Sequence, residues 1–337
     1  RRAAIDGRYW ARMTPFDRFR RIGRLSLGHY PTPVQELRRL RAHLGARPRL
    51  WIKRDDWTGP GFGGNKVRKL EYYLSKALKQ GYDTVITCGA ETSNHCRITA
   101  ALAAGCGLEC HLVLNPAAQA GRPASLLLDE LYGAHIHRVA GRDARAPEMS
   151  HLAGELRASG RRPMEIPLGA STPLGALGFV HAVGELTAPP SAIVHATSSG
   201  GTQAGLLAGL ALFGFEATRV IGISADDPAA EIAAAVRGIV AGIEVDLGAP
   251  ACSLQREAVV DDRFTGPAYG VPSPESAEAL RLLARTEGIV LDPVYTAKAF
   301  AGLLALLREG GFGGEESVLF WHTGGQLALF SASSQSE

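Results

Sequence analysis

Short apolar runs rich in β-branched residues recur along the chain from about residue 50. Runs of this length, bounded by turn residues, are typical of strands that are buried on both faces. They predict strands over residues 50–55, 84–89, 109–114, 135–140, 163–168, 191–197, 219–225 and 317–323.

Between these runs, apolar residues return at helical spacing. In residues 65–80 the apolar positions fall on one face of a helix, and Pro274 directly after Ser273 is a typical helix start. Strands that alternate with helices favour parallel sheets joined by right-handed crossovers. The predicted fold class is α/β, with parallel-rich open sheets flanked by helices. Helices are predicted over residues 65–80, 94–105, 201–213, 274–287 and 296–308.

The length and the charge limit the class of protein. A chain of 337 residues with 46% hydrophobic and 20% charged residues suits two packed domains. The net charge of +3 is too small to indicate a nucleic-acid partner. Arginines crowd residues 1–24, where we expect a solvated, partly mobile N-terminus, with a transit peptide as the weaker alternative. The chain begins with Arg1 and not with Met, which leaves open whether its start is complete.

The apolar runs and the cysteines point to a cytoplasmic protein. No run approaches the roughly 18 to 20 apolar residues of a membrane span, and none resembles a secretory signal. The cysteines are odd in number, include no CxxC pair, and lie mostly inside apolar runs. We therefore expect no disulfide framework, no metal site and no membrane partner. The cysteines are Cys88, Cys96, Cys106, Cys110 and Cys252.

Three predicted strand-to-helix turns carry polar or glycine-rich sequences. They are "GFGGNKVRKLE" (61–71), "TCGAETSNHCR" (87–97) and "HATSSGGTQAG" (195–205). Ser93 or Asn94 would cap the helix that follows the second turn. Ligands of open α/β sheets bind beyond the carboxyl ends of the strands, next to helix N-termini. The three turns are therefore the candidate binding elements.

The third turn has the composition of a phosphate cradle. Ser198, Ser199, Gly200, Gly201 and Thr202 offer consecutive backbone N–H groups and hydroxyls at a positive helix end. The stretch matches neither GxxxxGK[ST] nor GxGxxG, which disfavours a nucleoside triphosphate or a dinucleotide. A small phosphate ester fits better, although a glycine-rich turn can also simply connect two elements.

Two lysines in the first turn suggest the chemistry. A helix N-terminus disfavours passive cations, yet Lys66 and Lys69 both lie there. A lysine near a small phosphate ester is what a Schiff base with pyridoxal 5′-phosphate requires. Repulsion between the two ammonium groups would lower a lysine pKa and leave more free amine. The alternative is that these lysines are solvated surface residues, as most lysines are.

Four motifs then resemble a known family. They are "IKRDDWTGPGFGGNKVRKLEYYL" (52–74), "GAETSNHCRITAALAAGCGL" (89–108), "IPLGASTPLGALGFVHAVGEL" (166–186) and "RFTGPAYGVPSPESAEALRLLARTEGIVLDPVYTAKAFAGL" (263–303). Their order resembles the D-cysteine desulfhydrase and 1-aminocyclopropane-1-carboxylate deaminase family of pyridoxal-phosphate enzymes. The resemblance covers about residues 27 to 330 and implies fold type II, like that of the tryptophan synthase β subunit.

The resemblance implies roles for individual residues at the cofactor. Lys66 corresponds to the lysine that binds pyridoxal phosphate covalently, and Lys69 to the lysine that contacts its phosphate. Asn94 corresponds to the asparagine that hydrogen-bonds the phenolic oxygen of the cofactor. The other implied cofactor-binding residues are Ser199, Gly200, Gly201, Thr202, Thr296 and Thr323.

Further roles concern the substrate. Ser93 matches a serine that is proposed in the deaminases as nucleophile or proton carrier, and Tyr269 and Tyr295 match two active-site tyrosines. Backbone donors at Ser93, Asn94 and His95 are expected to hold the carboxylate of a small amino acid. For His95, a helix-start backbone donor is favoured over an acid or base.

The resemblance also implies an architecture. Residues 1–57 plus 163–337 would form a large cofactor-binding domain, and residues 58–162 a small inserted domain. The cofactor would lie between the two domains, with Lys66 on the side of the small one. Because relatives of this kind are generally homodimers, a homodimer is expected here.

The residue after "DPVY" favours one reaction of the family. Deaminases typically carry glutamate there, whereas this chain has Thr296, as desulfhydrases do. A hydroxyl from Thr296 or Thr323 would leave the pyridine nitrogen largely neutral, a weaker electron sink that suffices when a thiolate leaves. The predicted reaction is α,β-elimination of D-cysteine or a similar β-substituted amino acid to pyruvate, ammonia and sulfide, with Lys66 or Ser93 removing the α-proton.

Other activities stay open at this point. Deamination of 1-aminocyclopropane-1-carboxylate to 2-oxobutyrate and ammonia is the main alternative, and L-cysteate sulfo-lyase activity is a third. Glu91 and Thr92 replace the family's usual apolar residue and glutamine before "SN", which leaves the substrate open. A carrier of pyridoxal phosphate without catalysis is disfavoured because Ser93, Tyr269 and Tyr295 are present. A nicotinamide dehydrogenase is excluded by the missing GxGxxG.

Overall fold

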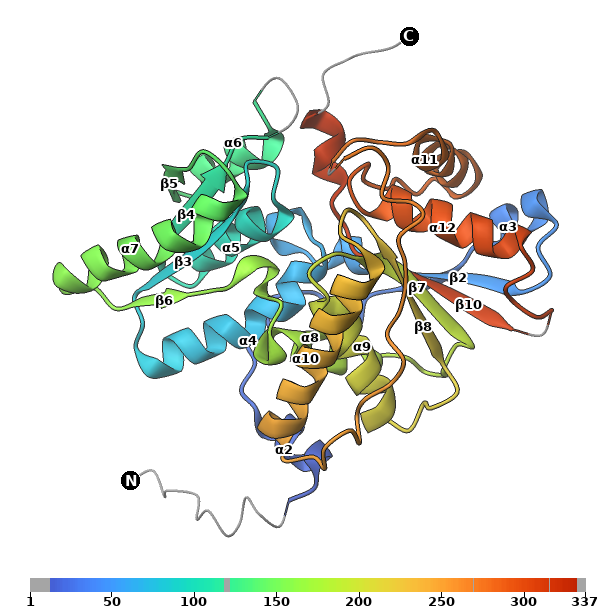
Figure 1. The fold of residues 1–337 in the computed structure, drawn as a ribbon, viewed down its shortest axis with the longest axis horizontal. Helices are drawn as coiled ribbons and strands as arrows, with labels where there is room; N and C mark the ends of the chain where they lie inside the picture. Colours follow the sequence, from blue (N-terminus) through green and yellow to red (C-terminus); the bar gives the residue numbers. More distant parts are fainter. Residues whose placement is uncertain (1–12, 118–121, 269, 315, 332–337) are drawn as a thin grey trace.

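The computed structural model describes residues 13–117, 122–268, 270–314 and 316–331. Within these residues the chain forms two β-sheets, each covered by helices, which lie side by side (Figure 1). The predicted α/β class is confirmed. No helix in the described part of the chain is long and apolar enough to cross a bilayer.

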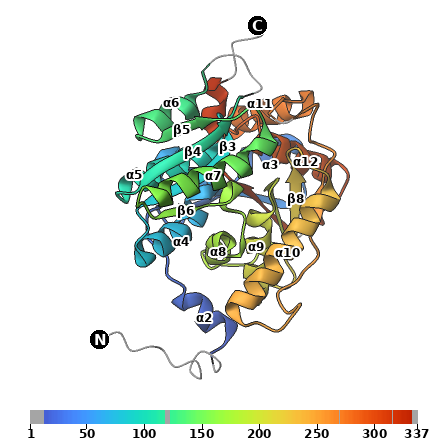
Figure 2. The same cartoon turned by 60° about the vertical axis from the view of Figure 1, so that its left-hand side comes forward.

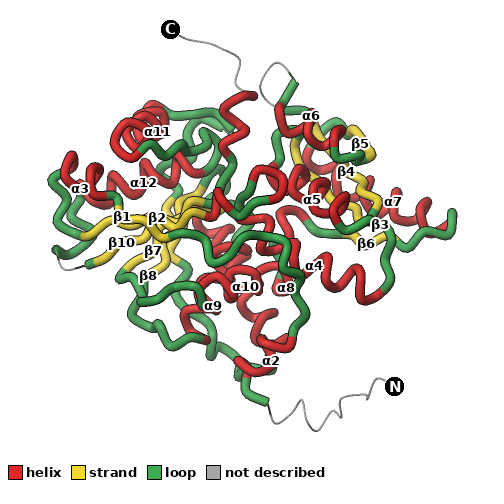
Figure 3. Tube along the Cα trace, turned by 180° about the vertical axis from the view of Figure 1, so that it is seen from behind, coloured by secondary structure: helices red, strands yellow, loops and turns green. Residues whose placement is uncertain are grey.

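The large sheet has the strand order β1-β2-β10-β7-β8-β9, and Figure 3 labels all of these strands except β9. β1 runs antiparallel to β2, and the other neighbouring strands pair in parallel. Alternate residues of each strand face opposite sides: Ile193 packs into a core with α8, α9 and α10, and Val194 packs into a core with α11 and α12. The strands are β1 (Val34–Glu36), β2 (Arg49–Arg54), β7 (Ala192–Thr197), β8 (Arg219–Ser224), β9 (Val259–Asp261) and β10 (Ser317–His322).

The small sheet has the strand order β5-β4-β3-β6, all parallel. Helices α5 and α6 cover one face, and α7 covers the other, in front of the sheet in Figure 2. β6 pairs with β3, so this sheet extends past the domain boundary predicted at residue 162. The strands are β3 (Thr84–Ala90), β4 (Glu109–Asn115), β5 (His135–Arg138) and β6 (Pro163–Glu165).

The predicted helices over residues 65–80, 94–105, 274–287 and 296–308 are confirmed as α4, α5, α11 and α12, and the one over 201–213 as α9. Ser273 caps α11 together with Ser276, as the Ser-Pro start suggests. The helices are α2 (Pro15–Arg21), α3 (Arg38–Leu44), α4 (Asn65–Gln80), α5 (Asn94–Gly105), α6 (Ala124–Leu131), α7 (Arg145–Ala158), α8 (Pro173–Val183), α9 (Gly201–Leu212), α10 (Ala229–Leu247), α11 (Pro274–Glu287) and α12 (Thr296–Arg308), and the short 3-10 turns are η1 (Asp55–Trp57), η2 (Pro60–Phe62), η3 (Arg142–Ala144), η4 (Leu168–Ala170) and η5 (Gln326–Ser331).

The arginine-rich N-terminal region is more structured than the sequence predicts. Residues 1–12 lie outside the described chain, but Thr14 caps α2 and Phe19 is buried in the core of the large sheet. Arg24 forms an ion pair with Glu71 of α4 at 2.6 Å. The expectation of a solvated segment is therefore wrong from α2 onward, because one aromatic side chain and one ion pair fasten it to the fold.

Helix α4 packs against α8 at very short range. A Cβ atom on Gly178 of α8 would lie 2.4 Å from the carbonyl oxygen of Arg68, so the two backbones approach more closely than a side chain permits. α4 is therefore held against the helices of the large sheet, although it precedes the first strand of the small sheet.

A buried ion network fixes α4 further. Arg68 is 1% exposed and donates two hydrogen bonds of 2.7 Å to Asp55, which follows β2. Its guanidinium also binds Glu185, beyond the end of α8, at 2.5 and 2.9 Å. Lys53 donates to Glu185 at 2.6 Å, and the indole of Trp321 in β10 donates to Asp55 at 2.7 Å. One network thus joins α4, β2, β10 and the end of α8.

The protonation states follow from these contacts. Burial acts to raise the pKa of Asp55, but Arg68 outweighs it through attraction and hydrogen bonding, and the pKa is lowered. Burial likewise acts to lower the pKa of Arg68, and Asp55 and Glu185 reverse the direction. The network is therefore charged at neutral pH.

We expect Arg68→Leu to lower the free energy of unfolding by about 3–5 kcal/mol near neutral pH, because Asp55 and Glu185 would remain buried without their partner. The pKa of Asp55 would then be raised. The deficit relative to the wild type should shrink as the pH falls toward about 4, because the variant's carboxyl becomes neutral in the folded state before it does so in the unfolded chain. It should shrink further below about pH 4, where wild-type Asp55 begins to lose its stabilising charge.

Urea denaturation at about pH 7 and about pH 4 measures both effects. Arg308→Leu is the matched control, since Arg308 pairs with Glu278 at 3.2 Å on the exposed surface, and a change within about 1 kcal/mol is expected. Equal losses in the two variants would show that the buried network does not hold α4.

Candidate active site

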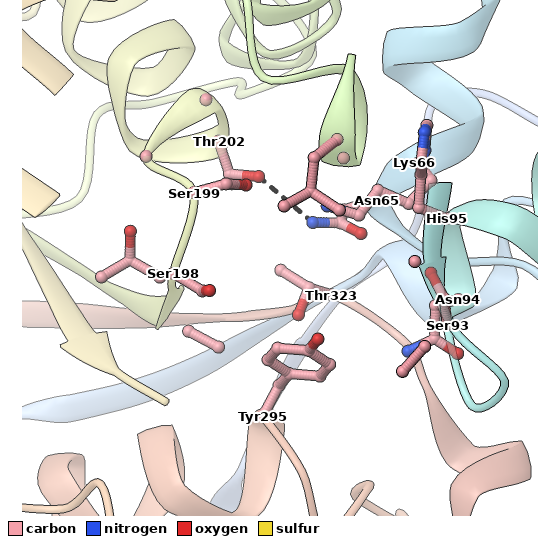
Figure 4. Close-up of a pocket in the computed structure, with 18 of the residues that line it drawn as sticks. Asn65, Lys66, Ser93, Asn94, His95, Ser198, Ser199, Thr202, Tyr295 and Thr323 are labelled. Atoms are coloured by element: carbon pink, nitrogen blue, oxygen red, sulfur yellow. Dashed lines mark hydrogen bonds between the residues drawn. The ribbon is translucent and has the colours of Figure 1, made fainter. Parts of the chain in front are cut away.

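A cavity of about 360 Å³ lies between the two sheets. Its walls come from the carboxyl ends of β3, β7 and β10, from the start of α4, and from the N-termini of α5 and α9. Figure 4 shows side chains from these elements surrounding one open space. The three turns singled out in the sequence meet here, as expected for carboxyl ends of parallel strands.

The predicted phosphate cradle forms one wall. Ser198 to Thr202 all line the cavity, and α9 begins at Gly201 with Gly200 as its N-cap in the left-handed conformation, at φ +77°. Asn65 donates a hydrogen bond of 3.1 Å from its side-chain amide to the hydroxyl of Thr202 (Figure 4). The helix end thus presents backbone N–H groups toward the cavity, an arrangement that suits a phosphate group.

Lys69 lies behind this cradle. Its amine donates a hydrogen bond to Ser171 at 3.1 Å, and the hydroxyl of Ser171 is 2.6 Å from that of Ser199. A Cβ atom on Gly201 would lie 2.7 Å from the Ser171 hydroxyl and 2.9 Å from the Lys69 amine. Only a glycine therefore lets the cradle sit on these polar groups.

Lys66 borders the same cavity from α4. Part of its side chain is accessible through the cavity, but protein atoms surround the amine closely enough for burial to lower its pKa to about 8. Lys69 is buried too, and burial together with repulsion from Lys66 lowers its pKa well below the usual value. The lowered pKa expected for Lys66 is present, but burial is its cause.

The start of α5 forms the opposite wall. Ser93, and not Asn94, is the N-cap, and its hydroxyl accepts from the backbone N–H of Cys96 at 3.2 Å. The side-chain oxygen of Asn94 accepts from Arg97 at 2.7 Å. The amide N–H groups of Asn94 therefore remain as donors, which suits an oxygen acceptor such as a phenolate.

His95 is a neutral acceptor in this wall. Thr87 donates its hydroxyl hydrogen to the carbonyl of Ile166 at 2.7 Å, so His95 must donate to Thr87 through Nε2, at 2.8 Å. Nδ1 then carries a lone pair, and it has no partner among the described residues. Burial, aided by Lys66 and Lys69, lowers the pKa of His95 well below its usual range, so the ring stays uncharged.

In the third wall, the predicted position of Thr296 at the cofactor is wrong. Tyr295 and Thr323 line the cavity, but Thr296 does not. Thr296 is fully buried at the first turn of α12, where its hydroxyl donates to Asp292 at 2.6 Å. The hydroxyl next to the cavity is therefore that of Thr323. Tyr269 lies outside the described residues.

Four charged residues that the sequence did not predict also line the cavity. Arg142 and Arg145 reach it from the segment after β5, and Asp226 and Asp227 from the end of β8. Arg142 pairs with Asp226 at 3.3 Å, which connects the two sheets across the cavity. All four follow the carboxyl end of a strand, and this position is the signal that would have found them.

The residues present fit pyridoxal phosphate. The cradle at the start of α9 supplies donors for a phosphate, and Lys66 supplies an amine that is largely neutral above about pH 8. Thr197 and His95 line the cavity, and the Thr197 hydroxyl and the His95 Nδ1 are buried without a partner among the described residues. Buried polar atoms are rarely left unpaired in folded proteins, so these two indicate that a polar ligand completes the site.

Comparison with known proteins identifies the class. Residues 25–324 match the family model for pyridoxal-phosphate dependent enzymes, and the chain belongs to this family. It is 39% identical over 326 residues to a D-cysteine desulfhydrase of Klebsiella pneumoniae subsp. pneumoniae, across 92% of this chain and 96% of the relative. The D-cysteine desulfhydrase of a second Klebsiella pneumoniae strain matches with the same identity and coverage. The cofactor is pyridoxal phosphate.

Solved structures agree with this assignment. A crystal structure of an "ACC deaminase homologue" superposes with a TM-score of 0.85 at 37% identity, covering 93% of this chain and 94% of that one. A fungal L-serine ammonia-lyase from Rhizomucor miehei superposes with a TM-score of 0.65 at 19% identity, over 88% of this chain and 94% of that one, which shows a shared fold only. The predicted fold type II is confirmed.

The lowered pKa of Lys66 predicts how fast cofactor-free protein takes up pyridoxal phosphate. Only the neutral amine attacks an aldehyde, so the rate should rise with pH up to about 8 and then level off. Borohydride reduction followed by mass spectrometry measures the covalent adduct at each pH. Lys66→Ala should form no adduct on α4, and Lys76→Ala, at an exposed position of the same helix, should match the wild type. A rate that keeps climbing through about pH 10, the range of an ordinary lysine, would contradict the burial argument.

Thr202→Val tests the cradle. Loss of one hydroxyl donor to a charged phosphate, worth roughly 1.5–3 kcal/mol, should weaken cofactor affinity by about one to two orders of magnitude. Equilibrium dialysis with pyridoxal phosphate measures it. Thr286→Val is the control, since that hydroxyl donates to Leu282 within α11 and does not line the cavity. An unchanged dissociation constant for Thr202→Val would mean that the phosphate binds elsewhere.

Proposed function

We propose that this chain catalyses α,β-elimination of D-cysteine, or of a closely similar β-substituted amino acid, to pyruvate, ammonia and sulfide. The observation that carries the proposal is the 39% identity, over almost the full length of both chains, to proteins named D-cysteine desulfhydrase. The chemistry of the cavity walls supports it independently, as follows.

Lys66 is the proposed base. Burial lowers the pKa of its amine to about 8, so about a tenth of the amine is neutral at pH 7 and about half at pH 8. The neutral form can take the proton from the α-carbon of the substrate. Ser93 lies in the wall opposite the cradle and is the alternative carrier of this proton. Bound pyridoxal phosphate supplies the electron sink that makes the α-proton acidic.

The N-terminus of α5 is the proposed carboxylate site. Ser93, Asn94 and His95 form the first residues of this helix end and line the cavity. The backbone N–H of Ser93 already donates to the carbonyl of Ala90 at 2.8 Å, so the donors proposed for the carboxylate are the N–H groups of Asn94 and His95 at this helix end. The substrate carboxylate would bind there, with its α-carbon toward Lys66.

Tyr295 is the proposed acid for the leaving group. Elimination breaks the bond between Cβ and sulfur, and the thiolate leaves with the bonding electrons. A proton from the Tyr295 hydroxyl would convert the thiolate to hydrogen sulfide. Water then hydrolyses the released enamine to pyruvate and ammonia, which balances the reaction. Tyr269 keeps its proposed role beside Tyr295 on the resemblance alone.

Thr323 supports elimination over ring opening. It lines the cavity from the end of β10 and would present a hydroxyl to the cofactor ring, whereas a carboxylate there would favour a protonated ring. A hydroxyl leaves the ring a weaker sink, sufficient for loss of a thiolate. The buried carboxylate of Asp292 does not line the cavity, and it accepts from the backbone N–H groups of Val294, Tyr295 and Thr296.

Deamination of 1-aminocyclopropane-1-carboxylate is the second candidate. The structural superposition on an ACC deaminase homologue, with a TM-score of 0.85, favours it specifically. L-cysteate sulfo-lyase activity would use the same elimination with sulfite as the leaving group.

We also propose that the chain works as a cytoplasmic homodimer with a small inserted domain. The five cysteines are free thiols, which fits a reducing compartment. The small sheet is built from residues 84–165, close to the proposed insertion at 58–162. The dimer rests on the family resemblance, and light scattering on the loaded protein measures it.

A substrate panel tests the reaction. Pyruvate and sulfide are followed from D-cysteine, L-cysteine, β-chloro-D-alanine and cysteate, and 2-oxobutyrate from the cyclopropane acid. D-cysteine should have the highest kcat/KM. Tyr295→Phe should lower kcat by about 100-fold or more while the cofactor stays bound. The control Lys76→Ala should change neither kcat nor the amount of bound cofactor. Faster deamination of the cyclopropane acid than release of sulfide from D-cysteine would replace the first candidate by the second.

A further inference from the structure

Three histidines and a glutamate gather at the start of β4 and β5, and none of them lines the cavity. Glu109 and His111 are two residues apart in β4, and His135 and His137 two residues apart in β5, so each pair shares one face of its strand. The parallel register places His111 directly beside His135. We call these four residues the β4–β5 histidine cluster.

Three ligand atoms of the cluster converge. Nε2 of His111 lies 2.8 Å from Oε1 of Glu109, and Nε2 of His135 lies 3.5 Å from the same oxygen. All three atoms lie within 4.8 Å of one another, and the rings of His111 and His135 stack with centroids 4.7 Å apart. Ligand atoms of a tetrahedral zinc ion, about 2.0–2.1 Å from the metal, are separated by about 3.4 Å. Small side-chain adjustments would therefore bring these atoms into a coordination sphere.

The fourth residue can orient the central ligand. Nδ1 of His111 lies 3.0 Å from Nε2 of His137. If His111 donates its single hydrogen from Nδ1 to His137, its Nε2 lone pair points to the side where Glu109 and His135 lie. Metal-ligating histidines usually donate their other ring N–H in this way, which fixes the tautomer and strengthens the ligand. The second oxygen of Glu109 is held by Arg161.

The buried ring of His111 has a polar neighbour on both sides. Without an ion, the His111 ring sits against a carboxylate on one side and another imidazole on the other, and a neutral ring can donate to only one of them.

We propose that the β4–β5 histidine cluster binds one divalent transition-metal ion of the zinc type. Nε2 of His111, Nε2 of His135 and Oε1 of Glu109 are the protein ligands. His137 positions His111, and water completes the sphere. Two imidazoles and one carboxylate are the ligand chemistry of zinc and of its neighbours nickel and cobalt, and unlike that of magnesium or calcium.

The position of the cluster indicates a structural role. Glu109 is level with Thr84 at the start of β3, whereas the cavity begins at Cys88 and beyond. Cys88 is level with Val113, two residues or roughly 7 Å beyond His111 along β4, so the ion would lie outside the cavity. It would join the buried strand β4 to β5, the edge strand of the small sheet. Ion binding should therefore raise the stability of the fold and leave substrate turnover unchanged.

Titration calorimetry with Zn²⁺ tests this proposal on chelator-treated, cofactor-loaded protein. The exposed thiol of Cys252 is removed first by Cys252→Ser, so that it cannot compete for zinc. One ion per chain should bind, and the thermal unfolding midpoint should rise with zinc. His135→Ala, at an exposed position, should weaken binding by about 100-fold or more and abolish the shift in midpoint. His111→Ala should have the same two effects. If His111→Ala does not fold, because His111 is buried, the result for His135→Ala alone tests the proposal.

His151→Ala is the matched control. His151 is an exposed histidine 3.4 Å from Glu155, but it belongs to no group of three ligands within the described chain. Zinc affinity should be unchanged in this variant. The proposal is overturned if the Cys252→Ser protein shows no saturable binding, if His135→Ala binds as well as its parent, or if His151→Ala loses as much affinity as His135→Ala.

Discussion

The ion network around Arg68 is the constraint on which the site depends. Positions 66 and 69 of α4 share one face of the helix, and position 68 projects from a different one. Asp55 and Glu185 hold Arg68 from elements of the large sheet. Because the helix can neither rotate nor slide without separating buried charges, Lys66 and Lys69 keep facing the cavity.

The cavity in turn depends on where strands end. The small sheet contributes the turn after β3, and the large sheet contributes the turns after β7, β8 and β10. α4 lies between them and is tied to the large sheet by the Arg68 network and by the close approach of Gly178. Val67, Leu70 and Leu74 of α4 also pack into the core of the small sheet, so the helix that carries both lysines is held from both sides. Contacts such as Arg142 with Asp226 connect the two sides.

The positions of several helices and of the binding turns could be predicted from the sequence, because the spacing of apolar residues and the turn residues agree with the fold. The bounds of α4, α5, α11 and α12 followed from apolar period and from caps, and the polar strand-to-helix turns identified Lys66 and the cradle. The strands β1 and β9 were not predicted, because three residues are too few to show a recognisable strand pattern of apolar residues. Short strands are recognised by their partners and not by their own sequence.

Other features depend on tertiary structure and could not be predicted from the sequence. Tyr295 and Thr296 are adjacent, yet the first turn of α12 sends one toward the cavity and the other onto Asp292, and one sequence does not show which. The β4–β5 histidine cluster is similar. The spacing of Glu109 and His111 is visible in the chain, but the place of His135 beside them is set by strand register.

The low pKa values of the cavity lysines have a consequence for the life of the protein in the cell. Burial is the main reason that both pKa values are low, so keeping a charged ammonium in the empty site costs folding free energy. A bound phosphate would remove part of this cost, because it attracts an ammonium and because any ligand that prefers the folded state stabilises it. Chains made while the cofactor is scarce would therefore be less stable than loaded chains and more exposed to proteolysis.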